Sequence, residues 1–429
     1  MVFHLPSGRR HIAVAAGVIG NIMEWYDFAL YGFMAQIISR IFFPDGNQTA
    51  NLLATYGIFA AGFIMRPLGS VVFGWLGDTI GRSRTMLISV SLMTAPTFIL
   101  GLLPSYAAIG LWAPICLVII RLLQGLSVGG EFSSSVTYLV ETAPEGKRGL
   151  SGSWANVGSM AGMLLGSGMA SFVMALFDDV SLKSYGWRIP FLFAAVLGSA
   201  AIYLRRNIPK SEHFTRHEQE HGASSPVKAA MTTNLKETIQ ASLFASAYGA
   251  VFYVSLVYIP TWLAEYSVSS KDLAMNFNTG ATALVILLAP IAGWISDKYI
   301  RRTRLLALVF LIDGILAVPL HLWMMSSGSS LAVAVSQFVF GALIAFPCGI
   351  APSVFVELFP TADRLSGYSI AFNLGLGVIG GATPMAATWL ISKTDLVISP
   401  GIYMAAWSGL AVVVLFLMRD RSREPLREN

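Results

Sequence analysis

Charged side chains lie inside stretches of the sequence that are otherwise apolar. The first stretch is Gly20–Gly32, GNIMEWYDFALYG, in which Glu24 and Asp27 stand three residues apart. A second stretch contains Arg121 and Glu131. A charge at the centre of a lipid bilayer costs at least about 2.5–3.5 kcal/mol, so such a residue is expected to face a cavity or a partner. If these stretches cross a membrane, the chemistry they suggest is proton binding by the acids and anion binding by the arginine.

Four acids are candidates for carrying a proton. Burial raises the pKa of a carboxyl group and a nearby cation lowers it, so an acid beside an arginine can exchange its proton when the pairing changes. The predicted proton-coupling residues are Glu24, Asp27, Glu131 and Asp313. The alternative for Glu24, Asp27 and Arg121 is that they form buried ion pairs that only fix helix packing. Asp313 is equally consistent with a packing polar residue.

Polar residues fall on one face of each of the two acidic stretches. At about 100° per residue, Asn21, Glu24, Asp27 and Tyr31 lie on a stripe about 120° wide, and Arg121, Gln124 and Glu131 lie within about 80° of one another. We expect these two faces to line one cavity. The predicted substrate-binding residues are Arg121, Arg66, Gln124, Asn21, Tyr31, Tyr253, Gln337 and Asn373.

Two groups of these residues have a structural alternative. Arg66 precedes a proline, so its guanidinium either binds a carboxylate bidentately or satisfies carbonyl groups freed at a kink. Gln124, Gln337 and Asn373 either hydrogen-bond to substrate or join helices to one another.

The elements that would position these residues are membrane-spanning helices. Apolar runs of about 20 residues, enough to cross a hydrocarbon core about 30 Å thick, recur along the chain. The twelve predicted spans are 12–39, 51–76, 85–104, 109–139, 149–177, 187–205, 236–264, 274–296, 305–325, 330–358, 365–391 and 399–418. On the fifth, Gly158, Gly162 and Gly166 have the spacing that lets a neighbouring helix approach closely.

Composition supports an integral membrane protein. Of the 429 residues, 55% are hydrophobic and 12% are charged, against about 25% charged in soluble domains, and the mean hydropathy is +0.66. The first run is too long for a signal peptide and is expected to remain as a helix. The two cysteines, Cys116 and Cys348, lie far apart inside predicted spans, so neither a disulfide nor a metal site is expected.

The distribution of Lys and Arg predicts the orientation. With the N-terminus in the cytoplasm, 21 of the 28 Lys and Arg fall on the cytoplasmic side and five on the outer side. This bias places both termini in the cytoplasm. The net charge of +5 and the pI near 9.2 then reflect membrane topology and do not indicate a nucleic-acid partner.

The chain divides into two similar halves. We expect a six-helix unit over 1–205, a cytoplasmic linker over 206–235 and a second six-helix unit over 236–429. GWLGDTIGR at Gly74–Arg82 recurs as GWISDKYIR at Gly293–Arg301, and ETAPEGKR at Glu141–Arg148 recurs as ELFPTADR at Glu357–Arg364. Internal duplication of a six-helix unit is typical of secondary transporters, whose substrate site lies between the repeats near the midplane.

Several of these motifs resemble one transporter family. The run of Gly74, Gly77, Asp78, Gly81 and Arg82 resembles the loop motif of the major facilitator superfamily. Within that superfamily, the segments EWYDFALYG, FIMRPLGS, RLLQGLSVGGEF, KRGLSGSW and GWRIPF are similar to those of the metabolite:proton symporter family, which includes proline/betaine, α-ketoglutarate, shikimate and citrate carriers. The second-half loop departs from the motif, with Ile300 in place of a glycine.

The resemblance implies an all-α membrane protein with twelve transmembrane helices in two pseudo-symmetric six-helix bundles, the major facilitator fold. It also implies a cytoplasmic gate in which Arg82 pairs with Glu141 and, by repeat symmetry, Arg301 with Glu357. The predicted gate residues are Asp78, Arg82, Glu141, Arg148, Asp297, Arg301, Glu357 and Arg364. Charges that only set membrane topology are the alternative.

The function that the sequence favours is proton-coupled uptake of a small polar metabolite, an organic acid or a zwitterion, by alternating access. An efflux antiporter, an uncoupled facilitator and a channel are the alternatives within transport. A membrane enzyme is disfavoured because no metalloprotease, Walker or nucleophile-elbow motif occurs. We expect no cofactor, the proton gradient as the energy source, the bilayer, protons and substrate as the partners, and a monomer in the inner membrane.

Overall fold

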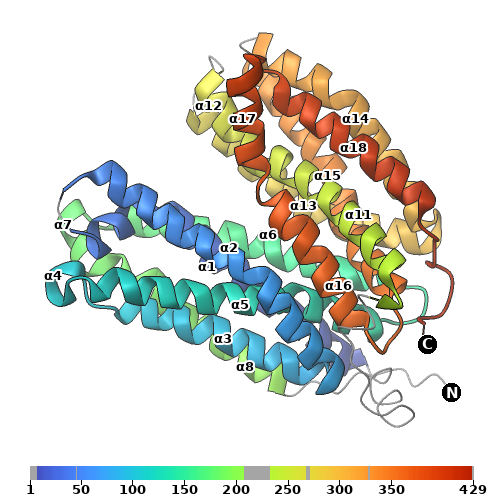
Figure 1. Ribbon diagram of the computed structural model, residues 1–429, viewed down its shortest axis with the longest axis horizontal. Helices are drawn as coiled ribbons and strands as arrows, with labels where there is room; N and C mark the ends of the chain where they lie inside the picture. The colour runs from blue at the N-terminus through green and yellow to red at the C-terminus, as the bar shows by residue number, and fades with distance from the viewer. Residues whose placement is uncertain (1–6, 45, 207–231, 267–270, 327–328, 428–429) are drawn as a thin grey trace. The chain divides into compact units, whose positions relative to one another are not determined.

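The computed structural model describes residues 7–44, 46–206, 232–266, 271–326 and 329–427, and regular secondary structure over these residues is helical. The predicted linker, 206–235, lies mostly outside the described residues. The first-half helices are α1 (Ser7–Phe42), α2 (Gln48–Thr79), α3 (Arg82–Leu102), α4 (Tyr106–Ile109), α5 (Trp112–Glu141), α6 (Arg148–Leu176), α7 (Asp179–Ser181) and α8 (Arg188–Arg206). Those of the second half are α11 (Leu235–Tyr253), α12 (Ile259–Tyr266), α13 (Lys271–Lys298), α14 (Arg302–Ser326), α15 (Ser330–Leu358), α16 (Arg364–Phe372), α17 (Thr383–Thr394) and α18 (Ser399–Leu417) (Figure 1).

The predicted spans coincide with these helices. Among the described residues, 11 helical segments are long and apolar enough to cross a membrane, and each overlaps one predicted span. The remaining predicted span, 12–39, lies in α1, which has 36 residues. Its polar residues Asn21, Glu24 and Asp27 lower its mean hydropathy. These are the same residues that distinguish this stretch in the sequence.

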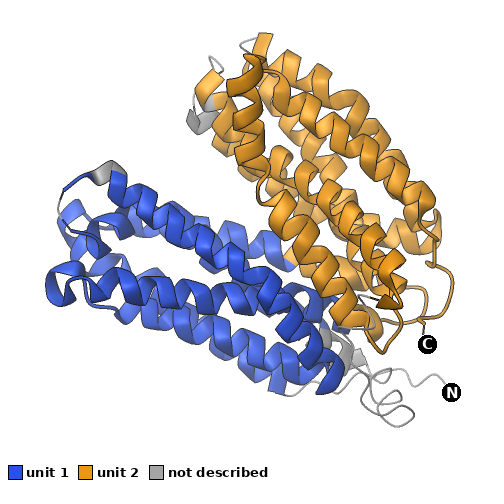
Figure 2. Cartoon of the chain, viewed as in Figure 1, with its two compact units in different colours: residues 1–138, 158–223 blue, residues 139–157, 224–429 orange. Residues whose placement is uncertain are grey.

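The chain forms two compact units (Figure 2). Unit 1 comprises residues 1–138 and 158–223, and unit 2 comprises residues 139–157 and 224–429. The segment 139–157, which includes the end of α5 and the first turns of α6, belongs to the first half of the sequence but packs with the second-half helices. The predicted division at residues 205 and 236 follows the sequence repeat. In the fold, the segment 139–157 belongs to unit 2 although it precedes that division.

Two second-half spans are interrupted by π-helical turns, Val254–Tyr258 between α11 and α12, and Asn373–Gly380 between α16 and α17. Pro260 follows the first of them and has no N–H to donate to the carbonyl of Leu256. Asn278 on α13 donates its side-chain amide to that carbonyl at 2.9 Å. The freed backbone group thus remains satisfied, as a membrane-embedded helix requires.

Close approach of α6 to α1 depends on glycine. A Cβ atom at Gly158 would lie 2.7 Å from the carbonyl oxygen of Val18, and one at Gly166 would lie 2.5 Å from that of Tyr26. Real Cβ contacts are not this short, so a side chain at either position would push the two helices apart. The predicted close packing along these glycines is confirmed, and it places the residues of α1 that carry the polar stripe.

Candidate functional site

The centre of the candidate site is an ion pair between Asp27 on α1 and Arg121 on α5. Arg121 Nη1 lies 2.6 Å from Asp27 Oδ2, and both side chains are buried. Asp27 Oδ1 accepts hydrogen bonds from Thr97 Oγ1 on α3 at 3.1 Å and from Gln124 Nε2 on α5 at 2.9 Å. A buried carboxylate needs such partners, and here they come from two helices of unit 1, α3 and α5.

Aromatic rings cover the guanidinium of Arg121. Its Cζ atom lies 3.7 Å from the ring centroid of Tyr31, which stacks on Phe59 at 5.4 Å. Tyr31 donates its hydroxyl to the carbonyl of Thr55 at 3.1 Å. Among the described residues, Nε and Nη2 of Arg121 have no hydrogen-bond partner. The ion pair therefore leaves donors of the same guanidinium available for another anion.

The polar faces of α1 and α5 also meet outside this ion pair. Asn21 donates Nδ2 to Ser135 Oγ at 2.8 Å and to the Gly17 carbonyl at 3.0 Å. This contact and the bond from Gln124 to Asp27 show that the two faces meet, and the cavity that we expect them to line stays a prediction.

Glu131, the third predicted acid of unit 1, is paired with a residue that sequence reasoning missed. Arg205 on α8 donates Nη1 to Glu131 Oε2 at 2.9 Å and Nη2 to Oε1. In the sequence, Arg205 is followed by Arg206 and a polar stretch, which indicated an exposed cytoplasmic end. It is in fact 2% exposed, and only the packing of α8 against α3 and α1 brings it inward.

Glu24 and Arg66 are buried with unused hydrogen-bonding atoms. Glu24 is 2% exposed and Arg66 is 4% exposed. Within the described part of the chain, Glu24 Oε2 and Arg66 Nε have no hydrogen-bond partner. The guanidinium of Arg66 lies over the rings of Phe63 and Phe28, at 4.3 and 4.8 Å from their centroids.

The predicted second-half residues are buried in unit 2, each with its own neighbours. Asp313 on α14 accepts a hydrogen bond from Ser408 on α18 at 2.6 Å, in the seam along which these two helices pack. Asn373 donates to the carbonyl of Ser369 on its own helix at 2.9 Å. Tyr253 packs edge-on against Phe252. Gln337 is fully buried, and neither atom of its amide has a hydrogen-bond partner among the described residues.

The first-half gate residues Asp78 and Arg82 form a buried ion pair in unit 1. Arg82 Nη1 lies 3.1 Å from Asp78 Oδ1 and donates to the carbonyl of Gly77 at 2.8 Å. Gly81, between them, has φ of +92°. This conformation is readily available to glycine alone, which accounts for the glycine in the loop motif.

The other gate residues form a group in unit 2 that we call the loop cluster: Glu141, Arg148, Asp297, Arg302, Glu357 and Arg364. Arg364 lies 2.7 Å from Glu141, and Glu357 lies 3.1 Å from both Arg148 and Arg302. The predicted partner of Glu357 was Arg301. That prediction is wrong by one residue, because α14 begins at Arg302, whose side chain is buried while that of Arg301 is exposed.

Asp297 in the loop cluster binds the start of α6. It accepts the backbone N–H of Gly149 at 2.8 Å and of Leu150 at 2.9 Å, and it pairs with Arg302 at 2.6 Å. The first N–H groups of a helix lack partners within the helix and carry a partial positive charge, so a carboxylate stabilises them. Asp297 is therefore one of the contacts that hold the segment 139–157 to unit 2.

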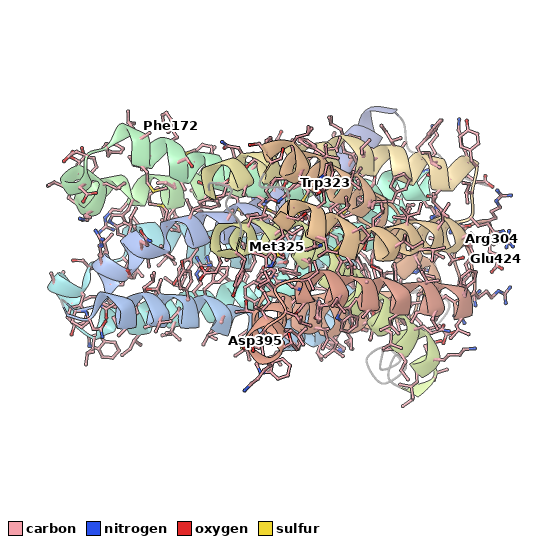
Figure 3. All side chains as sticks on the ribbon, turned by 90° about the horizontal axis from the view of Figure 1, so that it is seen from above. Phe172, Arg304, Trp323, Met325, Asp395 and Glu424 are labelled. Carbon is pink, nitrogen blue, oxygen red and sulfur yellow. The ribbon has the colours of Figure 1, made fainter. Side chains whose placement is uncertain are left out.

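The residues after α18 complete the loop cluster. We call Arg419–Arg427 the tail strap. Arg148 donates to the carbonyl of Glu424 at 2.6 Å, Arg302 to that of Ser422 at 3.2 Å, and Arg364 to that of Arg427 at 2.7 Å. Figure 3 shows Glu424 at the same end of unit 2 as Arg304, in the first turn of α14. Each of these three arginines thus binds a carboxylate of the loop cluster and a backbone carbonyl of the tail strap.

The described residues contain no group of three or more His, Cys, Asp or Glu side chains that could hold a metal ion. The site consists of charged and polar side chains held by helix packing.

Comparison with known proteins identifies the class. The family model for sugar (and other) transporters matches residues 12–250. The chain belongs to this family of the major facilitator superfamily. In fold it is similar to the proton:xylose symporter XylE, with a TM-score of 0.82 at 17% identity over 99% of each chain. It is also similar to the transporter FucP in the outward conformation, with a TM-score of 0.69 at 12% identity over 94% of this chain and 98% of that one. The predicted major facilitator fold is confirmed.

Similar proteins within this family are named as transporters of small metabolites. The chain is 31% identical to the proline/betaine transporter of Salmonella typhimurium, over 99% of this chain and 86% of the relative. It is 34% identical to the alpha-ketoglutarate permease of Escherichia coli, over 90% and 88%, and 32% identical to the citrate-proton symporter of Klebsiella pneumoniae, over 96% and 93%. The protein is a multi-pass membrane transporter and not an enzyme, and the predicted resemblance to these carriers is confirmed.

Proposed function

We propose that the protein takes up a small polar metabolite, an organic acid or a zwitterion, together with protons, by alternating access. We place it in the inner membrane with both termini in the cytoplasm, as the distribution of Lys and Arg favours. A relative that is named a citrate-proton symporter supports proton coupling. Relatives named for proline, betaine and alpha-ketoglutarate support a small polar substrate that bears a carboxylate.

The observation that carries the proposal is the buried pair of Asp27 and Arg121, 2.6 Å apart. When Asp27 binds a proton, it loses the charge that holds the guanidinium of Arg121. The guanidinium is then free to bind the carboxylate of a substrate, and its Nε and Nη2 atoms have no protein partner among the described residues. The proton on Asp27 and the substrate on Arg121 would therefore bind in sequence at one ion pair, and this order couples the two.

The loop cluster would serve as the gate on the cytoplasmic side. Its three carboxylates and three arginines connect the segment 139–157 to the ends of α13, α14, α15 and α16. Buried ion pairs are costly to break singly, at about 3–5 kcal/mol. A set of them that must separate together therefore suits a two-state gate, in which Asp78 and Arg82 would take part from unit 1.

The test is uptake by purified protein in proteoliposomes, with and without an imposed pH gradient, using proline, glycine betaine, α-ketoglutarate and citrate as probes. We expect gradient-driven accumulation of at least one probe by the wild type. Asp27→Asn should abolish accumulation and retain exchange of substrate across the membrane, because it mimics the protonated acid. The driving force is ample, since one charge crossing 100 mV is worth about 2.3 kcal/mol, or about fiftyfold accumulation.

Other results would identify the alternatives. Substrate moving out as protons move in would indicate an antiporter, and uptake that never exceeds equilibrium would indicate an uncoupled facilitator. Full coupling in Asp27→Asn would exclude Asp27 as the proton site and leave Glu24, Glu131 and Asp313 to be tested in the same way.

A further inference from the structure

Arg205 joins four helices of unit 1 through one side chain. From α8 it donates Nε to the carbonyl of Ala16 on α1 at 3.0 Å and Nη1 to that of Met86 on α3 at 2.5 Å. Its two terminal nitrogens bind both carboxylate oxygens of Glu131 on α5. Whatever changes the charge of Glu131 therefore changes how α8 is bonded to α5.

The pair formed by Arg205 and Glu131 packs directly on the backbone of α1 at Gly20. A Cβ atom at Gly20 would lie 2.6 Å from Arg205 Cζ and would also meet Glu131 Oε1. Four residues further along α1, on the same face, is Glu24. One helical turn is about 5.4 Å, so Glu24 lies within the reach of a rotamer change of a long arginine side chain.

Glu24 is a second buried acid on which this guanidinium acts electrostatically. The charged groups that act on it are Arg66 from α2, Glu131 from α5 and Arg205 from α8, and α3 contributes the Met86 carbonyl that binds Arg205. Within the described residues, Oε2 of Glu24 has no hydrogen-bond partner. A buried carboxylate atom without a partner is costly, so Glu24 is ready to accept a donor that becomes available.

We propose that Arg205 is a positioning residue that exchanges carboxylate partners, leaving Glu131 for Glu24 when Glu131 binds a proton. The inference rests on the proposed proton coupling, which supplies the proton. Glu131 takes up the proton and becomes neutral, its ion pair with Arg205 breaks, and the guanidinium, still protonated, forms a new pair with Glu24, which must be in its carboxylate form for this step. The exchange loosens α8 from α5 and tightens it on α1, which converts a protonation into a change in helix packing.

A stability cycle tests the exchange without transport. The unfolding equilibrium of purified protein is measured for wild type, Glu24→Gln, Glu131→Gln and the double variant. Either single variant leaves Arg205 one carboxylate, so we expect modest losses, whereas the double variant leaves its charge unpaired. The double variant should lose at least about tenfold more in the unfolding constant than the two single losses combined, which is about 1.4 kcal/mol of coupling. Adding Arg205→Met to the double variant should restore stability, because it removes the unpaired charge.

The control cycle pairs Glu131→Gln with Asp313→Asn, an acid in unit 2, and should be additive. A purely structural ion pair predicts a different result: Glu131→Gln alone would cause the full loss and Glu24→Gln would add nothing. Additivity of Glu24→Gln and Glu131→Gln would therefore overturn the inference.

The proton step has its own readout, the pH profile of substrate exchange with equal pH on both sides. We expect Glu131→Gln to remove one step of the profile, while a structural role would reduce the rate by one factor at every pH and would overturn the proton step. Failure of the symport proposal is distinguishable. In that case the wild type shows no gradient-driven uptake, whereas the stability cycle still shows coupling between Glu24 and Glu131.

Discussion

Arg121 has more hydrogen-bonding capacity than its described surroundings use. One terminal nitrogen binds Asp27, the face of the guanidinium lies on Tyr31, and two nitrogens have no hydrogen-bond partner among the described residues. A guanidinium can bond in its plane and stack on its face at the same time, which an ammonium cannot do. The combination of an ion pair, a ring contact and free donors therefore requires arginine at this position.

Arg121→Lys should keep the positive charge and lose substrate affinity. We expect KM for the transported substrate to rise by about ten- to a hundredfold, corresponding to the roughly 1.5–3 kcal/mol of a hydrogen bond to a charged group. The measurement is initial uptake rate against substrate concentration in proteoliposomes. Arg188→Lys is the matched control, because Arg188 binds the carbonyls of Gly101 and Leu103 and stacks on Trp187. An equal rise of KM in both variants would contradict the assignment.

The sequence predicted which polar residues of α1 and α5 lie on the faces that meet. It did not predict which acid pairs with which arginine. The 100° periodicity was enough to place Asn21, Asp27 and Gln124 on faces that meet, because membrane helices have regular geometry. It could not tell which acid binds Arg121, since that depends on the rotation and depth of α1 against α5. Arg205 had no signal, because an arginine at the end of an apolar run is the ordinary sign of a membrane boundary.

The membrane-spanning helices could be predicted from the thickness of a bilayer. The π-helical turns that interrupt two of them could not be predicted from the sequence. A span must be about 20 apolar residues long and satisfy its own backbone, so length and hydropathy identify it. Where a proline or a π-helical turn frees a backbone carbonyl within a span, the helix depends on a neighbour that satisfies it. Pro352 in α15, for example, leaves the carbonyl of Cys348 without an N–H partner, and Asn156 donates to it at 2.7 Å. No pattern in the sequence links these two positions, 192 residues apart.

The start of α16 provides a pH-dependent prediction. Asp363 is the N-cap residue, but its carboxylate accepts from Asn234 at 2.8 Å instead of capping the helix. Burial raises the pKa of Asp363 above its ordinary value of 3.8, and the bond from Asn234 partly opposes this. The folded protein therefore binds this proton more tightly than the unfolded chain, so the stability gained is present below pH 3.8 and lost as the pH rises through the folded-state pKa.

Asp363→Asn should remove that part of the pH dependence, because the amide does not ionise. We expect the difference in Tm between wild type and Asp363→Asn to change as the pH rises above 3.8, in the direction of relatively lower wild-type stability. Thermal unfolding in detergent across the pH range measures it. Asn234→Ala keeps the carboxyl group and should keep the decline. A difference in Tm that is the same at every pH would contradict the assignment.

For the molecule as a whole, sequence order and packing differ in one segment. Residues 139–157 belong to the first repeat, but they are part of unit 2, where the loop cluster binds them. Asp297 caps the start of α6, Glu357 pairs with Arg148, and Ser353 donates its hydroxyl to the carbonyl of Arg148 at 2.7 Å. The repeat echo predicted that these loops are related, whereas their mutual contacts follow only from the folded chain.

The tail strap should stabilise this arrangement, since it bonds to several elements of unit 2. Asp420 accepts the N–H and hydroxyl of Thr303 at 2.8 and 2.9 Å, and the carbonyl of Arg427 accepts from the N–H and hydroxyl of Thr361 at 3.1 and 2.9 Å. Together with the arginine contacts, these bonds satisfy backbone groups at the start of α14 and in the turn before α16. If the tail strap were detached from unit 2, these backbone groups would lose their partners.

Removal of the residues from Arg419 onward should therefore lower the Tm of the purified protein and increase proteolysis within residues 139–157. Asp420→Ala should reproduce part of the loss, about 1–2 kcal/mol, because it removes the side-chain partner of the N–H and hydroxyl of Thr303 in the first turn of α14. Arg423→Ala is the control, as its side chain is exposed and it should behave as wild type. Limited proteolysis with mass spectrometry locates the cleavage sites. Unchanged cleavage and unchanged Tm in the truncated protein would mean that the loop cluster holds residues 139–157 through its carboxylate pairs alone, with no contribution from the strap.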